Sequence, residues 1–142
     1  MKADQCIFFQ LAKASQAAAK FWTCRLTGAH VTAAQGIVLG FLHENDQVTS
    51  RDLGERVMQD SATLTGILDR LEKASLVERK THPEDRRALS VCLTTRGRQL
   101  TENLIALAET ANQDFLEPLT SEEQVILRLL LKKLCQKHRG EV

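Results

Sequence analysis

Apolar residues recur every three or four positions over most of this chain, which is the spacing of one face of an α-helix. The pattern predicts helices over residues 4–27, from 32 to near 45–46, from 61 to about 71, over 95–116 and from 120 onward. A further short helix, capped by Thr49 or Ser50, is predicted to hold Leu53, Val57 and Met58. In the helix from 120 onward, the apolar positions spread over most of the helix circumference. A helix of that kind needs burial on most sides. The first helix and the last two are therefore expected to form a dimer interface.

Short polar motifs mark where several helices begin. Thr32 is followed three residues later by Gln35, and Thr120 is followed three residues later by Glu123. Both pairs are capping boxes, in which two side chains satisfy the free backbone N–H groups of a first turn. The segments that they open are therefore expected to be separate helices.

Two short helices are predicted on either side of a turn at residues 58–60. The second has its apolar residues at i, i+3, i+4 and i+7, namely Leu64, Ile67, Leu68 and Leu71. Asp60 or Ser61 is expected to cap it. A pair of short helices joined by a turn of three or four residues is a helix-turn-helix.

From Leu76 the period of the pattern changes to two. Residues 77–81 read as one strand, and Leu89, Val91 and Leu93 alternate with Ser90 and Cys92 in a second. The fold is therefore predicted to be mainly α with a small β-hairpin wing. This is a winged helix-turn-helix with N- and C-terminal dimerisation helices, divided within one compact chain into residues 1–30, 31–95 and 96–142.

Small polar side chains occupy the face of the 61–71 helix that is opposite its apolar stripe. Ser61, Thr63 and Thr65 lie there together with Arg70. Short side chains let a helix lie deep in the major groove of DNA, and hydroxyl groups bond base edges or phosphates. The alternative is an ordinary solvated helix face, which usually carries long charged residues. The short side chains favour the DNA-binding interpretation.

The predicted hairpin tip carries two arginines beside an aspartate, Asp85, Arg86 and Arg87. An arginine can enter a narrow minor groove, where the negative potential is concentrated. Asp85 can hold an arginine in place through a bidentate pair. The alternative is a solvated salt bridge, which stabilises a protein by about 0–1 kcal/mol. Beside a helix-turn-helix, contact with DNA is the favoured interpretation.

Three motifs together resemble the MarR (multiple-antibiotic-resistance regulator) family of bacterial transcription factors. They are the segments 61–71, 82–88 and 93–97. The resemblance implies a homodimer that binds a pseudo-palindromic operator in double-stranded DNA, usually as a repressor. The family's recognition-helix positions fall on Ser61, Thr63, Thr65 and Arg70, and Arg51 matches a position that often touches phosphate. Its wing motif Asp-x-Arg falls on Asp85 and Arg87, with Arg86 between them as a further candidate for DNA contact.

The resemblance also implies a small-molecule effector in a crevice between the dimer helices and the winged region. The candidate residues for this crevice are Phe8, Phe9, Phe21, Trp22, Phe41 and His43. The alternative, which we favour, is that these aromatic residues belong to the ordinary core.

Cys6 is a candidate redox residue, because some relatives sense oxidants through a cysteine near the start of the first helix. A helix N-terminus favours the reactive thiolate form. However, organic-hydroperoxide sensors typically hold that cysteine with tyrosines, and this chain has no tyrosine. The alternative is a small apolar residue without redox chemistry. The other cysteines, Cys24, Cys92 and Cys135, lie in apolar patterns and are expected in the core.

Composition narrows the class of protein further. The net charge is +1, but residues 79–98 hold six arginines and lysines against two acids, a local basic stripe that phosphates can use.

No signal peptide or membrane span is expected, and the scattered cysteines fit a reducing cytoplasm. Neither a metal site nor an enzyme motif is found, and no cofactor is implied. A winged-helix module that binds protein instead of DNA remains the alternative function.

Overall fold

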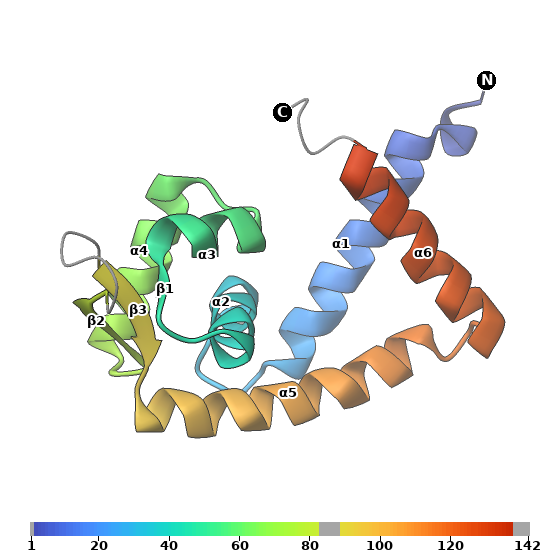
Figure 1. The fold of residues 1–142 in the computed structure, drawn as a ribbon. Coiled ribbons are helices and arrows are strands. Elements are labelled where there is room, and N and C mark those ends of the chain that lie inside the picture. Colours follow the sequence, from blue (N-terminus) through green and yellow to red (C-terminus); the bar gives the residue numbers. More distant parts are fainter. Residues whose placement is uncertain (1, 83–88, 138–142) are drawn as a thin grey trace. The chain divides into compact units, whose positions relative to one another are not determined.

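The computed structural model describes residues 2–82 and 89–137 of the chain, which divides into two compact units, Met1–Ala108 and Glu109–Val142. Each unit is described by itself. In chain order, the elements in Figure 1 are η1 (Ala3–Gln5), α1 (Ile7–Arg25), α2 (Ala33–Glu44), β1 (Val48–Thr49), α3 (Ser50–Val57), α4 (Ser61–Lys73), β2 (Val77–Thr81), β3 (Leu89–Leu93), α5 (Thr95–Leu116) and α6 (Ser121–Lys137).

The predicted capping boxes are present. Thr32 Oγ1 accepts a hydrogen bond from the N–H of Gln35 at 3.2 Å, and the Gln35 side chain accepts one from the N–H of Thr32 at 2.8 Å. Thr120 and Glu123 make the same reciprocal pair at the start of α6. Because these signals are local, they locate helix starts correctly from the sequence alone.

The first helix differs from its predicted span of 4–27. A separate 3-10 turn occupies Ala3–Gln5, and α1 runs only from Ile7 to Arg25. Gly28 has φ of 91°, a conformation that glycine adopts without steric cost. The chain therefore leaves the helix slightly before the glycine.

The core of the first unit lies between α2, α3, α4 and the strands. The predicted apolar stripe of α4, made of Leu64, Ile67, Leu68 and Leu71, is buried. It packs with the buried residues Val38, Leu39, Leu42, Leu53, Val57, Leu76, Val77, Val91 and Leu93. This core holds α3 and α4 in fixed positions and leaves the polar face of α4 exposed.

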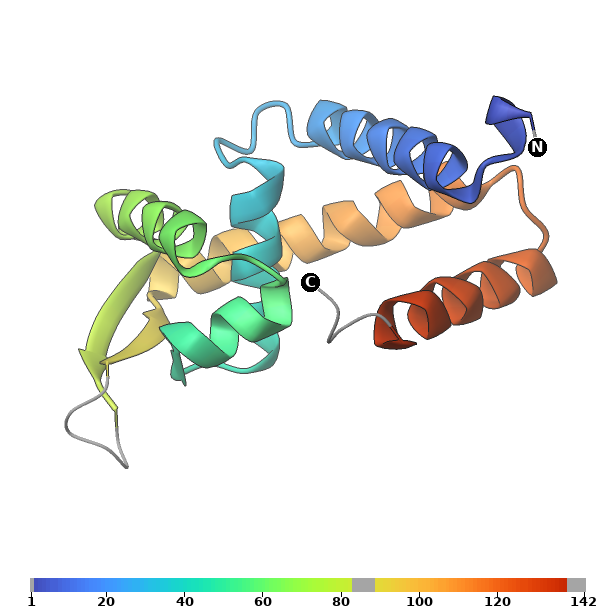
Figure 2. The same ribbon diagram turned by 90° about the horizontal axis from the view of Figure 1, so that it is seen from above.

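The wing is part of a three-stranded antiparallel sheet in the order β1-β3-β2. The hairpin was predicted, with Val77 opposite Leu93 and Thr81 opposite Leu89. Figures 1 and 2 both show β2 and β3 side by side, next to α4. The strand β1 was not predicted, because two residues are too short to show a period of two.

The sequence predicted that buried and exposed side chains would alternate along β3, and this is wrong at the start of the strand. Leu89 is 55% exposed, whereas Ser90 is 1% exposed and Cys92 is also buried. The physical reason is that β3 is the central strand and contacts both α2 and α3. A strand in that position is covered more completely than an edge strand with one solvated face.

A close backbone contact joins the wing to the start of α5. A Cβ atom placed on Gly97 would lie 1.9 Å from the carbonyl oxygen of Leu76. The same carbonyl accepts a hydrogen bond from the N–H of Thr94 at 3.1 Å, and Thr94 Oγ1 accepts one from the N–H of Gly97 at 2.9 Å. The motif at residues 93–97 therefore fixes where α5 begins, and it requires a residue without a side chain at Gly97.

Apolar side chains remain exposed on helices of both units. On α1 they are Ile7, Phe8, Phe9 and Leu11. On α6 they are Val125, Ile126, Leu129, Leu130, Leu131 and Leu134. Within the described ranges, no helix is both long and apolar enough to cross a membrane.

Candidate DNA interface

The polar face of α4 is exposed, as its sequence pattern predicted. Ser61, Thr63, Thr65 and Arg70 all lie on the surface of the first unit. Asp60 caps the helix, because its Oδ1 accepts a hydrogen bond from the N–H of Thr63 at 2.9 Å. The first two turns of α4 therefore present short side chains on a helix whose opposite face is anchored in the core.

Gly66 lies on this face and has no steric role among the residues that the structure describes. A Cβ atom placed on Gly66 would meet nothing within 4 Å. Glycine in a helix interior destabilises the helix by roughly 1 kcal/mol relative to alanine. The packing of the described residues gives no reason for that loss. A partner that approaches the helix backbone closely from outside would supply one.

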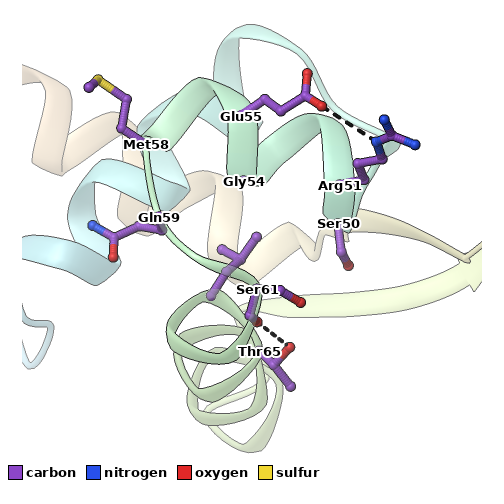
Figure 3. A pocket seen from close by; sticks show the side chains of 9 residues that line it. Ser50, Arg51, Gly54, Glu55, Met58, Gln59, Ser61 and Thr65 are labelled. Atoms are coloured by element: carbon purple, nitrogen blue, oxygen red, sulfur yellow. Dashed lines mark hydrogen bonds and ion pairs between the residues drawn. The ribbon is translucent and has the colours of Figure 1, made fainter. Parts of the chain in front are cut away.

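A groove of 460 Å³ separates α3 from the N-terminal half of α4. Figure 3 shows Ser50, Arg51, Gly54 and Glu55 on the α3 side and Ser61 and Thr65 on the α4 side. Met58 and Gln59 also line it at the turn between the helices, where Met58 adopts the left-handed conformation with φ of 55°. The sequence predicted the turn but not the groove, because the groove depends on how the two helices cross.

Arg51 lies at the edge of this groove and is only weakly held. Its Nε lies 3.4 Å from Glu55 Oε1, and the two side chains are 87% and 70% exposed. Exposed pairs of this type contribute little to stability. Arg70 makes no ion pair among the described residues. Both guanidinium groups are therefore available to an anionic partner.

Arg79 links the wing to α4, a role that the sequence did not reveal. Its guanidinium bonds Asp69 at 2.7 Å and also pairs with Glu72, both on α4. The hydrogen bond from Arg79 to Asp69 raises the pKa of Arg79. Arg79 is ten residues from Asp69 and seven from Glu72, and no local sequence pattern links a strand residue to helix residues at those distances. These two ion pairs, called the Arg79 clamp below, could therefore not be predicted.

In the described part of the basic stripe predicted at residues 79–98, three of the four cations pair with acids of the chain. Besides the Arg79 clamp, Lys80 pairs with Glu78 at 2.6 Å and Arg98 pairs with Asp46 at 2.6 Å. Arg96 donates to the carbonyl of Ala74 at 3.1 Å. The described part of the stripe therefore leaves little unpaired charge for phosphates, and the predicted phosphate-binding surface as a whole stays a prediction. The three predicted wing residues, Asp85, Arg86 and Arg87, lie outside the described residues.

The aromatic residues predicted for a ligand crevice lie in different surroundings within one chain. Trp22 and Phe41 are half-buried against the core, and Phe21 lies 4.9 Å from the Arg25 guanidinium. Phe8 is 78% exposed and lies about 20 Å from Phe21 along α1. The core interpretation therefore holds for Trp22 and Phe41 and is wrong for Phe8 and for Phe9, which is also exposed.

His43 differs from the other crevice candidates because it is polar and partly buried. Its Nδ1 is buried and has no hydrogen-bond partner among the described residues. A buried polar atom usually has a partner. The assignment of Phe8, Phe21, Trp22, Phe41 and His43 to a ligand crevice stays a prediction.

The cysteines divide into two groups. Cys92 is buried, as predicted, and burial raises the pKa of its thiol. The prediction of a core position is wrong for Cys24 and Cys135, which are exposed in the chain. Cys6 is half-buried and occupies the N-cap position of α1. Among the described residues, no group of three or more His, Cys, Asp or Glu could hold a metal ion.

Comparison with known proteins identifies the family. The model of the MarR family matches residues 31–89. The organic hydroperoxide resistance transcriptional regulator of Bacillus subtilis (strain 168) is 32% identical over 110 residues, which cover 78% of this chain and 75% of that protein.

Two solved structures agree with this assignment. A probable transcriptional regulator from Pseudomonas aeruginosa is 34% identical with a TM-score of 0.88, covering 94% of this chain and 99% of that one. BpsR of Bordetella bronchiseptica, whose DNA binding is regulated by 6-hydroxynicotinic acid, is 28% identical with a TM-score of 0.88, covering 94% and 96%. The chain therefore belongs to the MarR family of DNA-binding transcriptional regulators, and both the resemblance and the predicted winged-helix fold are confirmed.

Proposed function

We propose that this chain is a homodimeric repressor that places α4 of each copy in the major groove of a pseudo-palindromic operator. The observation that carries the proposal is the exposed face of α4, where small polar side chains lie beside Gly66, a glycine that no other described residue approaches. Two such helices in a dimer would lie about 34 Å apart, which is one turn of B-DNA. Arg51 and Arg70 would contact phosphate or guanine, while Arg86 and Arg87, with Asp85, would reach the minor groove.

The homodimer is supported by the apolar residues that stay exposed on α1 and α6. Isolated surface leucines are ordinary, but six large apolar residues on one helix of seventeen residues are not. A second copy of the chain is the partner proposed to cover them. A twofold axis would then match the symmetry of an inverted-repeat operator.

Release by a small-molecule effector completes the proposal. It is supported by BpsR, whose DNA binding is regulated by 6-hydroxynicotinic acid. An effector would bind best to dimers whose two α4 helices are not spaced to match successive turns of the major groove. Binding would raise the fraction of dimers in that form and so lower DNA affinity. Selection of bound duplexes from a random pool, repeated with small phenols, carboxylates and peroxides, tests both steps. Inverted repeats should be enriched, and one compound class should abolish the enrichment. A pool without enriched duplexes would favour a protein-binding module.

Gly66→Ala is expected to make the protein more stable and its DNA binding weaker. Alanine should stabilise α4 by about 0.5–1 kcal/mol, because the new Cβ meets nothing within 4 Å. The same methyl group would enter the DNA interface and lower affinity roughly tenfold. Thermal melting and duplex titration measure the two effects separately.

Gly36→Ala in α2 is the matched control, because a Cβ placed there also meets nothing within 4 Å. It should stabilise the protein without changing DNA affinity. If Gly66→Ala binds the selected duplex as tightly as the wild type, the face around Gly66 does not contact DNA.

An oxidant-responsive repressor is the second candidate function. It is favoured by Cys6 at the N-cap of α1 and by the similarity to the organic hydroperoxide resistance regulator. An organic hydroperoxide should then release the wild type from its operator but leave Cys6→Ser bound. Because Cys24 and Cys135 are exposed and so also open to an oxidant, their serine variants are the controls and should respond like the wild type. If the hydroperoxide releases Cys6→Ser from the operator as readily as the wild type, Cys6 does not sense the oxidant and this second candidate function is excluded.

A further inference from the structure

The two threonine hydroxyls on the exposed face of α4 have no proton left for an outside partner. A threonine hydroxyl carries one proton and two lone pairs. Thr63 Oγ1 lies 2.6 Å from Asp60 Oδ2, and Thr65 Oγ1 lies 2.7 Å from the backbone carbonyl oxygen of Ser61. Each hydroxyl therefore donates its proton within the chain and keeps only lone pairs.

The chemistry of the partners fixes the direction of both hydrogen bonds. A backbone carbonyl oxygen accepts and cannot donate, and the same holds for an ionised carboxylate. The side-chain hydrogen bond from Thr63, followed by its backbone N–H, lowers the pKa of Asp60, so the carboxylate stays ionised at neutral pH. Neither threonine can turn its proton outward without giving up its bond.

Ser61 differs from its two neighbours on α4. Its carbonyl accepts the proton of Thr65, but its own hydroxyl has no hydrogen bond within residues 2–82 and 89–137. Ser61 can therefore either donate to a phosphate or accept from a base. Thr63 and Thr65 have only the second option.

Phosphates are poor partners for the hydroxyls of Thr63 and Thr65. Phosphate oxygens only accept hydrogen bonds, so they cannot bond a hydroxyl that offers lone pairs alone. The ionised Asp60 adds a negative charge beside Thr63 that repels a phosphate, against the usual preference of helix N-termini for anions. The threonines are therefore matched to hydrogen-bond donors.

The major groove of DNA offers two kinds of exocyclic donor, the N4 amino group of cytosine and the N6 amino group of adenine. We propose that Thr63 and Thr65 determine operator specificity by accepting hydrogen bonds from these amino groups. This inference rests on the proposed insertion of α4 in the major groove. On the same helix, Thr63 and Thr65 would act as hydrogen-bond acceptors and Arg70 as a donor. Arg70 carries only N–H donors, which suit guanine or phosphate.

A protein–DNA double-mutant cycle tests the proposal on the duplex selected with the wild type. At each adenine or cytosine of the half-site, the amino group is removed by using purine or 2-pyrimidinone. At one position, this change should weaken wild-type binding about 3- to 10-fold, the effect of one hydrogen bond. Thr65→Val should lose a similar factor on the intact duplex and nothing further on the modified one. Thr63→Val should show the same coupling at another position.

Thr65→Ser is the matched control, because it keeps the hydroxyl and removes the methyl group. It should retain the preference for the amino-bearing base. Equal loss by Thr65→Val on every duplex would identify a phosphate contact and overturn the proposal. If Thr65→Val keeps the preference for the amino-bearing base and Thr65→Ser loses it, the methyl group is the part that is recognised. That result would also overturn the proposal. A wild type that selects no duplex would instead refute the proposed operator binding.

Discussion

Replacing Gly97 with alanine is expected to destabilise the fold by roughly 3 kcal/mol or more. The new Cβ would lie 1.9 Å from the carbonyl oxygen of Leu76, and neither atom belongs to a flexible side chain that could move away. The contact can be relieved only by shifting the start of α5 or the start of β2. Because domains are stable by about 5–15 kcal/mol, the melting temperature should fall by about 10 °C, as measured by circular dichroism.

Gly36→Ala serves as the comparison for this measurement, because its Cβ has open space and should raise the melting temperature slightly. Thr94→Ala is a second comparison within the same junction. It removes the hydroxyl that accepts from the N–H of Gly97 and donates to the carbonyl of Ser75, without introducing a clash. It should therefore destabilise the protein less than Gly97→Ala. A Gly97→Ala protein that melts like the wild type would show that the backbone contact is not needed.

The expected effect at Gly97 illustrates what the sequence could and could not predict about the fold. The starts of α2 and α6 were predicted because a cap such as Thr32 with Gln35 is complete within four residues. The reason for Gly97 lies 21 positions away at Leu76, so the motif could be matched to a family but not explained. The two-residue strand β1 exists only through its pairing with β3 and has the same limitation.

The candidate site shows the same division between local and distant causes. The exposed face of α4 followed from helical periodicity, since its apolar stripe fixed which residues point away from the core. The Arg79 clamp depends on two elements meeting, and the proton direction of Thr63 and Thr65 depends on side-chain rotamers. Periodicity carries information about neither, so these features required the structure.

Exposure of the apolar residues on α6 leads to the second large effect. Leu130→Asp is expected to convert the proposed dimer into monomers. In the chain alone, Leu130 is 52% exposed, so an aspartate there adds little strain to the folded monomer. In a twofold interface, two copies of the charge would be buried without partners, at a cost of several kcal/mol each. Light scattering or sedimentation should show the monomer, while circular dichroism should still show folded helices.

The same variant should lose operator affinity by about 100-fold or more, because a monomer contacts one half-site and loses the gain from linking two. Lys132→Asp is the matched control. Two positions further along α6, Lys132 lies on the opposite side of the helix and is also exposed. It should leave the dimer and its DNA affinity nearly unchanged. If Leu130→Asp remains a dimer that binds the operator, Leu130 lies outside the interface and another surface joins the two copies. If Leu130→Asp and Lys132→Asp both form monomers, an aspartate on either side of α6 is enough to break the dimer. The apolar face of α6 would then not be the surface that specifically joins the two copies.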